Sequence, residues 1–183
     1  RGELGGHLRL YERLPAMSDW SIAIDNLQRE VHNAGVEVLL NTAADVETLS
    51  RLDADHVVIA TGASYQRDGL SLYRPERSAI PGADLDHVWD AGSAAHKALE
   101  DPKAFGEKVL IIDETGAHLP FAVAEVLATA GVQVEVVSPR LYAGEKPYSN
   151  LDILYIFPRL QALAVTITQQ YFVEAIRAVE ADV

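Results

Sequence analysis

The chain has 183 residues, a hydrophobic fraction of 49% and a formal net charge of −12. Its length suits one domain of ordinary size or two small ones, and its composition is that of a globular protein. No apolar run approaches the ~20 residues that span a bilayer. The surplus of acidic residues argues against nucleic acid and anionic membranes as partners. Because cysteine is absent, these residues cannot ligate an iron–sulfur cluster through thiolates. The absence of disulfides also makes the reducing cytoplasm the default expectation for the location.

The first elements in chain order are a loop, a helix and a short strand. Residues 1–14 show no periodicity and predict a loop that contains Gly5-Gly6. Apolar residues then recur at alternating spacings of four and three, which predicts a helix with one buried stripe that ends near Gly35. The stripe consists of Trp20, Ile24, Leu27, Val31 and Ala34. A strand over 36–40 and a helical turn or two over 45–52 follow.

Residues 55–62 form the most informative stretch of the first half. An apolar run that ends in Ala60-Thr61-Gly62 predicts a buried parallel strand and a tight turn with a close backbone approach. Because ligands lie beyond the carboxyl ends of parallel strands, we expect Gly62 near the Gly5-Gly6 loop. On a central strand, truncating Val58 or Ile59 to alanine would cost roughly 2–4 kcal/mol.

The second half predicts a parallel α/β unit. Residues 63–106 are irregular, with one helix around 91–99. Strands over 109–112 and 132–137 flank a helix over 119–130, which is a βαβ unit with a right-handed crossover. A loop over 140–150, a helix over 151–163 and a strand over 165–168 complete the expected order.

The turn after the first strand of this unit departs from a nicotinamide-binding fingerprint. That fingerprint requires Gly-x-Gly-x-x-Gly, so that backbone amides can approach the pyrophosphate and helix and strand can pack closely. Here Asp113, Thr115 and His118 stand at the three glycine positions. Asp113 and Glu114 also suit the dipole of the following helix but would repel a pyrophosphate there. The pattern predicts a Rossmann fold without its ligand.

Other polar residues give weaker signals. The second strand ends in Ser138 rather than in an acidic residue that would bind a ribose. Arg140 could be a ligand of a 2′-phosphate, but a solvated arginine is the favoured interpretation. The six histidines show no metal-ligand spacing. Neither a catalytic residue nor a metal site is therefore predicted within the chain.

Five segments together resemble a known family of flavoenzymes. They are Leu4–Leu8, Leu14–Trp20, Val57–Ala63, Ile80–Ala83 and Leu127–Gly131. They are similar to the C-terminal half of trimethylamine dehydrogenase and of the related old-yellow-enzyme group. That group includes dimethylamine dehydrogenase, histamine dehydrogenase, N-methylproline demethylase-like proteins and 2,4-dienoyl-CoA reductase. The resemblance covers most of residues 4–140.

The resemblance implies an α/β fold with Rossmann-like parallel sheets of the FAD/NAD(P) type. Residues 1–80 would be part of an FAD- or ADP-type domain, 81–105 a connecting segment, and 106–183 a degenerate, truncated NAD-type domain. FAD or ADP is the implied ligand of the first part. The implied cofactor-binding residues are Gly5, Gly6, His7, Leu8, Ala60, Thr61 and Gly62.

The resemblance also implies a function for the intact protein. An N-terminal barrel outside these residues would carry FMN, a 4Fe–4S cluster and the catalytic groups. The loss of glycines at 113–118 favours the branch of amine dehydrogenases and N-demethylases, which passes electrons to an electron-transferring flavoprotein and works as a homodimer. An NAD(P)H-dependent dienoyl-CoA reductase and a non-catalytic nucleotide-binding or docking module remain as alternatives. The fragment alone is expected to be inactive and to bind little nucleotide.

Overall fold

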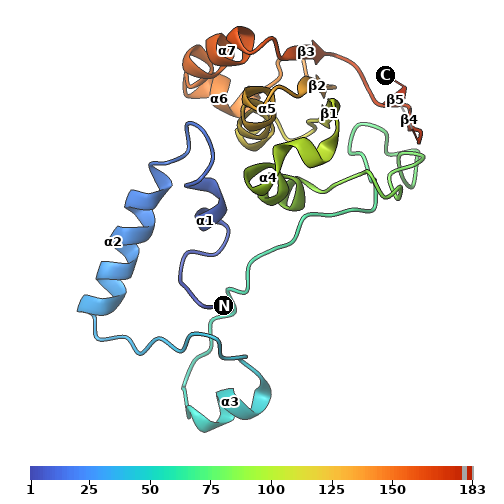
Figure 1. Cartoon of the computed structure of the whole chain (residues 1–183). Helices are drawn as coiled ribbons and strands as arrows, with labels where there is room; N and C mark the ends of the chain where they lie inside the picture. Colours follow the sequence, from blue (N-terminus) through green and yellow to red (C-terminus); the bar gives the residue numbers. More distant parts are fainter. Residues whose placement is uncertain (179–180, 183) are drawn as a thin grey trace.

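The computed structural model describes residues 1–178 and 181–182. Its N-terminal part consists of three helices joined by long irregular segments, and its C-terminal part is a compact α/β unit (Figure 1). The N-terminal helices are α1 (Leu8–Tyr11), α2 (Trp20–Asn33) and α3 (Val46–Arg51). The α/β unit contains α4 (Ala91–Glu100), a 3₁₀ turn (Pro102–Phe105), β1 (Lys108–Ile112), α5 (Leu119–Thr129), β2 (Gln133–Ser138), α6 (Glu145–Ser149), α7 (Ile153–Ala162) and β3 (Thr166–Gln169). Two short strands follow, β4 (Ala175–Ile176) and β5 (Ala181–Asp182).

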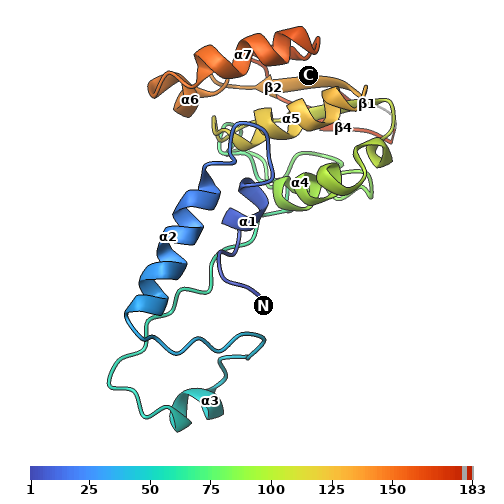
Figure 2. The ribbon, with the colours of Figure 1, turned by 60° about the vertical axis from the view of Figure 1, so that its left-hand side comes forward.

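The α/β unit confirms the predicted parallel topology. Its sheet has the order β1-β2-β3, and both neighbouring pairs are parallel. The register places Val109 opposite Val134, and Val136 opposite Ile167. Helix α5 connects β1 to β2, and α6 and α7 lie between β2 and β3 in the sequence (Figure 2). Pro120 in the first turn of α5 and Gly131, at φ +87° after its end, delimit that helix as the sequence predicts.

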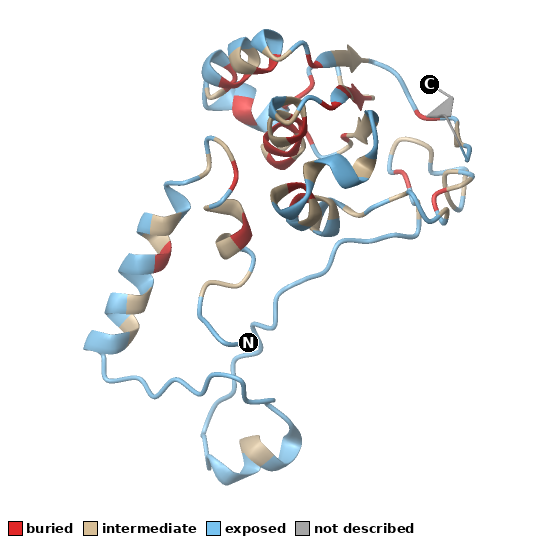
Figure 3. Ribbon diagram, in the orientation of Figure 1, coloured by how far each residue is buried: buried red, intermediate tan, exposed pale blue. Residues whose placement is uncertain are grey.

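One hydrophobic core holds this unit together. Phe121 of α5 is 1% exposed and lies edge-on to Phe157 of α7, with ring centroids 5.8 Å apart. Valines 134 and 136 of β2 complete the layer beneath the helices. Leu10 and Leu14 join the same core from the N-terminal part, which ties that part to the α/β unit. The buried residues in Figure 3 concentrate here accordingly.

The helix predicted from the first apolar stripe is present as α2, but its stripe is not buried. Ile24 is the buried residue of this helix, whereas Leu27 is 61% exposed. Periodicity fixes which residues share a face of a helix, and a neighbouring element must still cover that face. Helix α2 contacts α1, and α1 is only four residues long. The expectation of a buried stripe is therefore wrong in this structure.

The two strands predicted in the first half are also absent. Within the described residues, 36–40 and 55–62 have no regular secondary structure and pair with no strand. Val58 is 88% exposed and Ile59 is 82% exposed, so the predicted central strand is wrong here. An apolar run becomes a strand only when a neighbouring strand supplies hydrogen bonds and a packing layer. No such neighbour is found for these segments between residues 1 and 178.

Smaller differences concern segments that were predicted as loops. Short helices occur at α1 and α6, within the loops expected over 1–14 and 140–150. The 3₁₀ turn, β4 and β5 have no counterpart in the sequence prediction, and the other helices and strands lie within a few residues of the predicted bounds. In the described part of the chain, no helix is long and apolar enough to cross a membrane.

Candidate nucleotide site and the occupied second turn

A hollow of about 550 Å³ lies beside the Gly5-Gly6 loop. Its lining is rich in basic side chains and comes from the first thirteen residues and from α4. The lining residues are Arg1, Gly2, Glu3, Gly6, His7, Arg9, Leu10, Glu12, Arg13 and His96. In a chain with a net charge of −12, this concentration of arginine is the clearest feature that suits an anionic ligand.

The loop that borders the hollow depends on its two glycines. Gly5 has a φ of +113° and Gly6 a φ of +56°, a region that other residues adopt only with strain. This turn lets the amides of Leu8 and Arg9 donate hydrogen bonds to the carbonyls of Gly5 and Gly6, at 3.1 and 3.3 Å. The glycines thereby start α1 and place His7 on the wall of the hollow.

The arginines of the hollow differ in how their charge is balanced. Arg9 is paired with Glu3 at 3.5 Å and with Glu12 at 3.1 Å. Arg13, four residues further along, forms no ion pair among the described residues and is exposed. Arg1, which also lines the hollow, likewise forms no ion pair among the described residues, so these two arginines carry the positive charges that no carboxylate balances there.

The structure places the predicted cofactor-binding residues in two groups. Gly6 and His7 line the hollow, Gly5 belongs to the same turn, and Leu8 lies in α1 without lining the hollow. Residues 60–62 do not line it, and a side chain at Gly62 would meet no atom within 4 Å. The assignment of 60–62 to a cofactor thus remains a prediction.

Tyr65, which was not singled out from the sequence, connects the 55–62 segment to α1. Its hydroxyl lies 2.9 Å from the hydroxyl of Tyr11, and its ring centroid lies 6.2 Å from that of His7. Burial raises the pKa of Tyr65 above its ordinary value, and the hydrogen bond to Tyr11 adds to the rise. Arg1, Arg9, Arg13 and His96 were also missed as lining residues, and Arg13 lies beyond the end of α1, so no helical spacing would have indicated the set.

A dinucleotide would bind at the turn after β1, but a side chain of the turn itself, Asp113, fills that place. Asp113 is 1% exposed, and its Oδ1 accepts hydrogen bonds from the Thr115 amide, the Thr115 hydroxyl and the Gly116 amide, each at 2.9 Å. Its Oδ2 has no hydrogen-bond partner within the described part of the chain. The turn donors that a phosphate would use therefore already bind a carboxylate.

The neighbouring residues Glu114 and Arg140 are engaged as well. The carboxylate of Glu114 accepts hydrogen bonds from the Ser71 hydroxyl at 2.5 Å and the Leu72 amide at 3.3 Å. Arg140 donates from Nε to the Glu114 carbonyl at 3.1 Å and forms an ion pair with Glu145. The interpretation of Arg140 as a lone solvated side chain is thus wrong, because its guanidinium has partners in Glu114, Glu145 and the ring of Tyr73, although 27% of the side chain stays exposed.

His118 occupies the third glycine position and links two helices. Its Nε2 lies 2.8 Å from Oδ2 of Asp152, which directly precedes α7. The hydrogen bond from His118 is the main cause of the lowered pKa of Asp152, and Asn150 adds to it. The ring therefore connects the starts of α5 and α7 and stands where close helix–strand contact would need a glycine.

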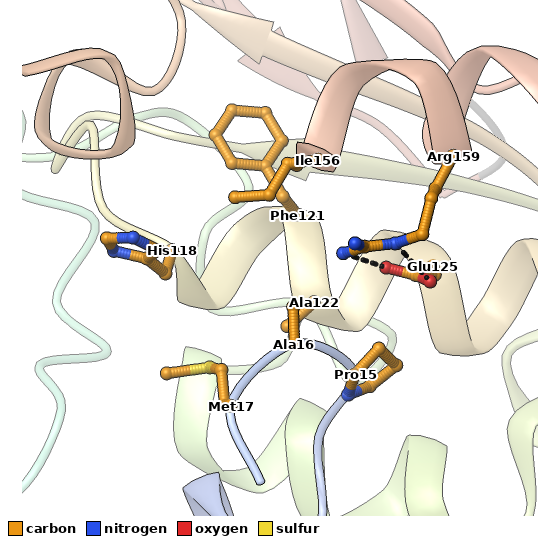
Figure 4. A pocket seen from close by; sticks show the side chains of 9 residues that line it. All are labelled: Pro15, Ala16, Met17, His118, Phe121, Ala122, Glu125, Ile156 and Arg159. Carbon is orange, nitrogen blue, oxygen red and sulfur yellow. Dashed lines mark hydrogen bonds and ion pairs between the residues drawn. The ribbon is translucent and has the colours of Figure 1, made fainter. Parts of the chain in front are cut away.

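A second, much smaller hollow lies between residues 15–17, α5 and α7 (Figure 4). It offers about 10 Å³, which is room for one water molecule at most. Arg159 of α7 donates two hydrogen bonds, at 3.0 and 3.1 Å, to the carboxylate of Glu125 on its wall. This hollow is a packing junction between the N-terminal part and the α/β unit, and it is too small for a substrate.

These observations define the class of protein. A parallel sheet of order β1-β2-β3, with helix α5 between β1 and β2 and a six-residue turn before that helix, is a Rossmann-like α/β unit. In this chain Asp113 binds the amides of the turn after β1. A hollow lined by glycine and arginine residues lies between the N-terminal part and α4.

Comparisons with known proteins identify the family. The chain is 34% identical over 94% of its length to a probable N-methylproline demethylase from Rhizobium meliloti (strain 1021), and 29% identical over 89% to an NADH oxidase from Thermoanaerobacter brockii. It superimposes on histamine dehydrogenase from Rhizobium sp. 4-9 with a TM-score of 0.84, at 27% identity and 96% coverage. No protein-family model matches. The chain belongs to the trimethylamine dehydrogenase and 2,4-dienoyl-CoA reductase family.

The matches cover only part of each relative. The chain corresponds to 23% of the demethylase, 24% of the NADH oxidase and 27% of the histamine dehydrogenase. It therefore spans about a quarter of the proteins that it resembles.

Proposed function

We propose that this chain is the adenine-nucleotide-binding region of a flavin-dependent amine dehydrogenase or N-demethylase. The intact protein would oxidise a C–N substrate with FMN in a barrel domain, and electrons would pass through a 4Fe–4S cluster to an electron-transferring flavoprotein. The demethylase and the histamine dehydrogenase among the similar proteins support this branch. The protein would act as a homodimer in the cytoplasm.

The observation that carries the proposal is the contrast between the two candidate ligand sites. The hollow beside Gly6 combines a glycine backbone with several basic side chains. The turn at 113–118 has its donors bound to Asp113 and carries a second carboxylate, Glu114. At an effective dielectric of ~20, one like-charge pair at 4 Å costs about 4 kcal/mol. This repulsion exceeds the ~1 kcal/mol that a helix dipole returns, so a pyrophosphate is disfavoured at the turn.

The residues at the first hollow suit the phosphates of FAD or ADP. The Gly5-Gly6 turn allows a close backbone approach, and Arg13 and His7 could hold phosphate oxygens. When bound, FAD would supply a redox centre and ADP a structural anchor. The chain's own part in either case is to bind the phosphates and to orient the nucleotide.

We further propose that residues 1–80 are an incomplete nucleotide-binding domain, joined through 81–105 to the NAD-type unit of 106–183. The exposed apolar runs at 36–40 and 57–59 support this division, because they carry the composition of buried strands. In the intact protein these runs would pair with strands from the part of the relatives that the chain does not span. That sheet would bring residues 60–62 to the nucleotide.

A test of the nucleotide site is the replacement Arg13→Ala in the intact flavoprotein. We expect the Kd for ADP to rise by roughly tenfold or more, because a hydrogen bond to a charged phosphate is lost. Bound nucleotide would be released by denaturation and quantified by chromatography. Arg51→Ala, an exposed arginine of α3 outside the hollow, is the matched control. Equal nucleotide content in both variants would refute the assignment of the hollow.

An NAD(P)H-dependent reductase is the second candidate, and the similarity to the NADH oxidase favours it. We expect the intact protein to show no rapid flavin reduction when it is titrated with NADH or NADPH, because the 113–118 turn is closed. Flavin absorbance in a stopped-flow instrument measures this, and dithionite provides the fully reduced reference. Saturable reduction at micromolar nicotinamide would replace the amine-dehydrogenase assignment by the reductase.

A further inference from the structure

The carboxyl ends of β1, β2 and β3 lie at one edge of the sheet, and a residue that follows each strand takes part in one cluster. Glu114 follows β1, Arg140 follows β2 and Phe172 follows β3. In open α/β sheets, ligands lie in the crevice beyond this edge. What occupies this crevice in the chain decides what the unit can bind.

The segment 69–73, here called the strap, reaches all three of these positions. The Ser71 hydroxyl and the Leu72 amide bind the two carboxylate oxygens of Glu114, at 2.5 and 3.3 Å. The ring of Tyr73 lies 5.8 Å from the guanidinium carbon of Arg140 and 6.3 Å from the ring centroid of Phe172. Ser71 is 5% exposed, so the strap is attached through a buried hydroxyl, whereas the side chains of Leu70 and Leu72 on either side are 49% and 83% exposed.

Contacts with residues 80–83 and with Glu174 also hold the two ends of the strap. Its first residue, Gly69, has a φ of +69° and accepts a hydrogen bond from the Ile80 amide at 2.8 Å. A Cβ at this glycine would lie 2.4 Å from that of Ala83, so the close contact requires glycine. Directly after the strap, Arg74 and Arg77 pair with Glu174 at 3.0 and 2.7 Å, and this stretch passes beside β4 in Figure 1.

We propose that the strap is a fixed internal occupant of the ligand crevice of the β1-β2-β3 sheet. The proposal rests on the proposed absence of nicotinamide binding and names the element that closes the site. Glu114 is its anchor, because both oxygens of that carboxylate are used by strap donors. A movable lid would instead have an exposed hinge and few buried polar contacts at its tip.

Hydrogen exchange measured by mass spectrometry on the chain tests this proposal. In the wild-type chain we expect the amides of Leu72 and Tyr73 to exchange slowly, because each donates a hydrogen bond within the cluster. Glu114→Ala should raise the exchange rate of the Leu72 amide by roughly tenfold or more, since its hydrogen bond to a charged acceptor is lost. The Tyr73 amide should exchange faster as well, because its acceptor, the Ser71 hydroxyl, loses its own bond to Glu114. Glu107→Ala, an exposed carboxylate at the opposite end of β1, should leave the rate unchanged.

Ser71→Ala provides a second variant in case Glu114→Ala does not fold. It removes one of the two donors to Glu114 and should accelerate exchange of the Leu72 amide by less than the loss of the whole carboxylate. The Tyr73 amide loses its acceptor directly in this variant and should also exchange faster. Unprotected wild-type amides at 72–73, or a strap unaffected by both variants, would overturn the proposal. These outcomes are independent of the nucleotide content of the first hollow and of flavin reduction by NADH, which test the proposed function separately.

Discussion

Replacing Phe121 by alanine is expected to lower the free energy of unfolding by about 3–5 kcal/mol, the usual cost of removing a buried aromatic ring. Phe121 is 1% exposed, lies edge-on to Phe157 and belongs to the core shared by α5, α7 and β2. It also contacts the turn at Gly144, where an added Cβ would lie 2.6 Å from the ring. The ring thus holds together two helices and the loop after β2. Urea unfolding followed by circular dichroism measures the loss.

Val58→Ala is the informative comparison for this measurement. From the sequence, Val58 looks as buried as any residue of the chain, yet it is 88% exposed. We therefore expect its truncation to change the stability of this chain by less than ~0.5 kcal/mol. A cost of several kcal/mol for Val58→Ala would show that the 55–62 segment folds as a packed strand within this chain. A cost below ~1 kcal/mol for Phe121→Ala would mean that the core lies elsewhere.

The contrast between these two residues shows what could be predicted from the sequence. The α/β unit was predictable because strand 109–112, its helix and strand 132–137 find their partners within about thirty residues of one another. The apolar run at 55–62 carries an equally clear local signal, but its partners are not among residues 1–178. Local pattern identifies the type of element, and only the presence of a neighbour decides whether the element forms.

The candidate sites were predictable to a different extent. The loss of glycines at 113–118 is visible in the sequence, and it indicated a turn without a dinucleotide. That Asp113 itself binds the turn donors, and that Ser71 binds Glu114 across 43 positions of sequence, are long-range or three-dimensional facts with no local pattern. The hollow beside Gly6 was anticipated through its glycines. Its arginines were not, because surface arginines are common in every soluble protein.

Asp113→Ala is expected to destabilise the chain by about 2–3 kcal/mol, because it leaves the amides of Thr115 and Gly116 without their acceptor. An opposing effect reduces this cost: Asp113 is a buried carboxylate whose Oδ2 has no partner among the described residues, and its removal relieves some desolvation. We expect the first effect to be larger, since one oxygen satisfies three donors at 2.9 Å.

Asp113→Asn separates the two effects. It keeps an oxygen in place of Oδ1 and removes the charge, so it should cost less than half as much as alanine. Asp55→Ala, at an exposed carboxylate far from the turn, should change the stability by less than ~0.5 kcal/mol. Thermal unfolding of the three variants in one buffer provides the comparison. If Asp113→Ala is neutral or stabilising, the carboxylate does not hold the turn, and the proposal that this turn does not bind a dinucleotide loses its main support. If alanine is costly and asparagine is mild, the carboxylate oxygen takes the place that a phosphate oxygen would fill.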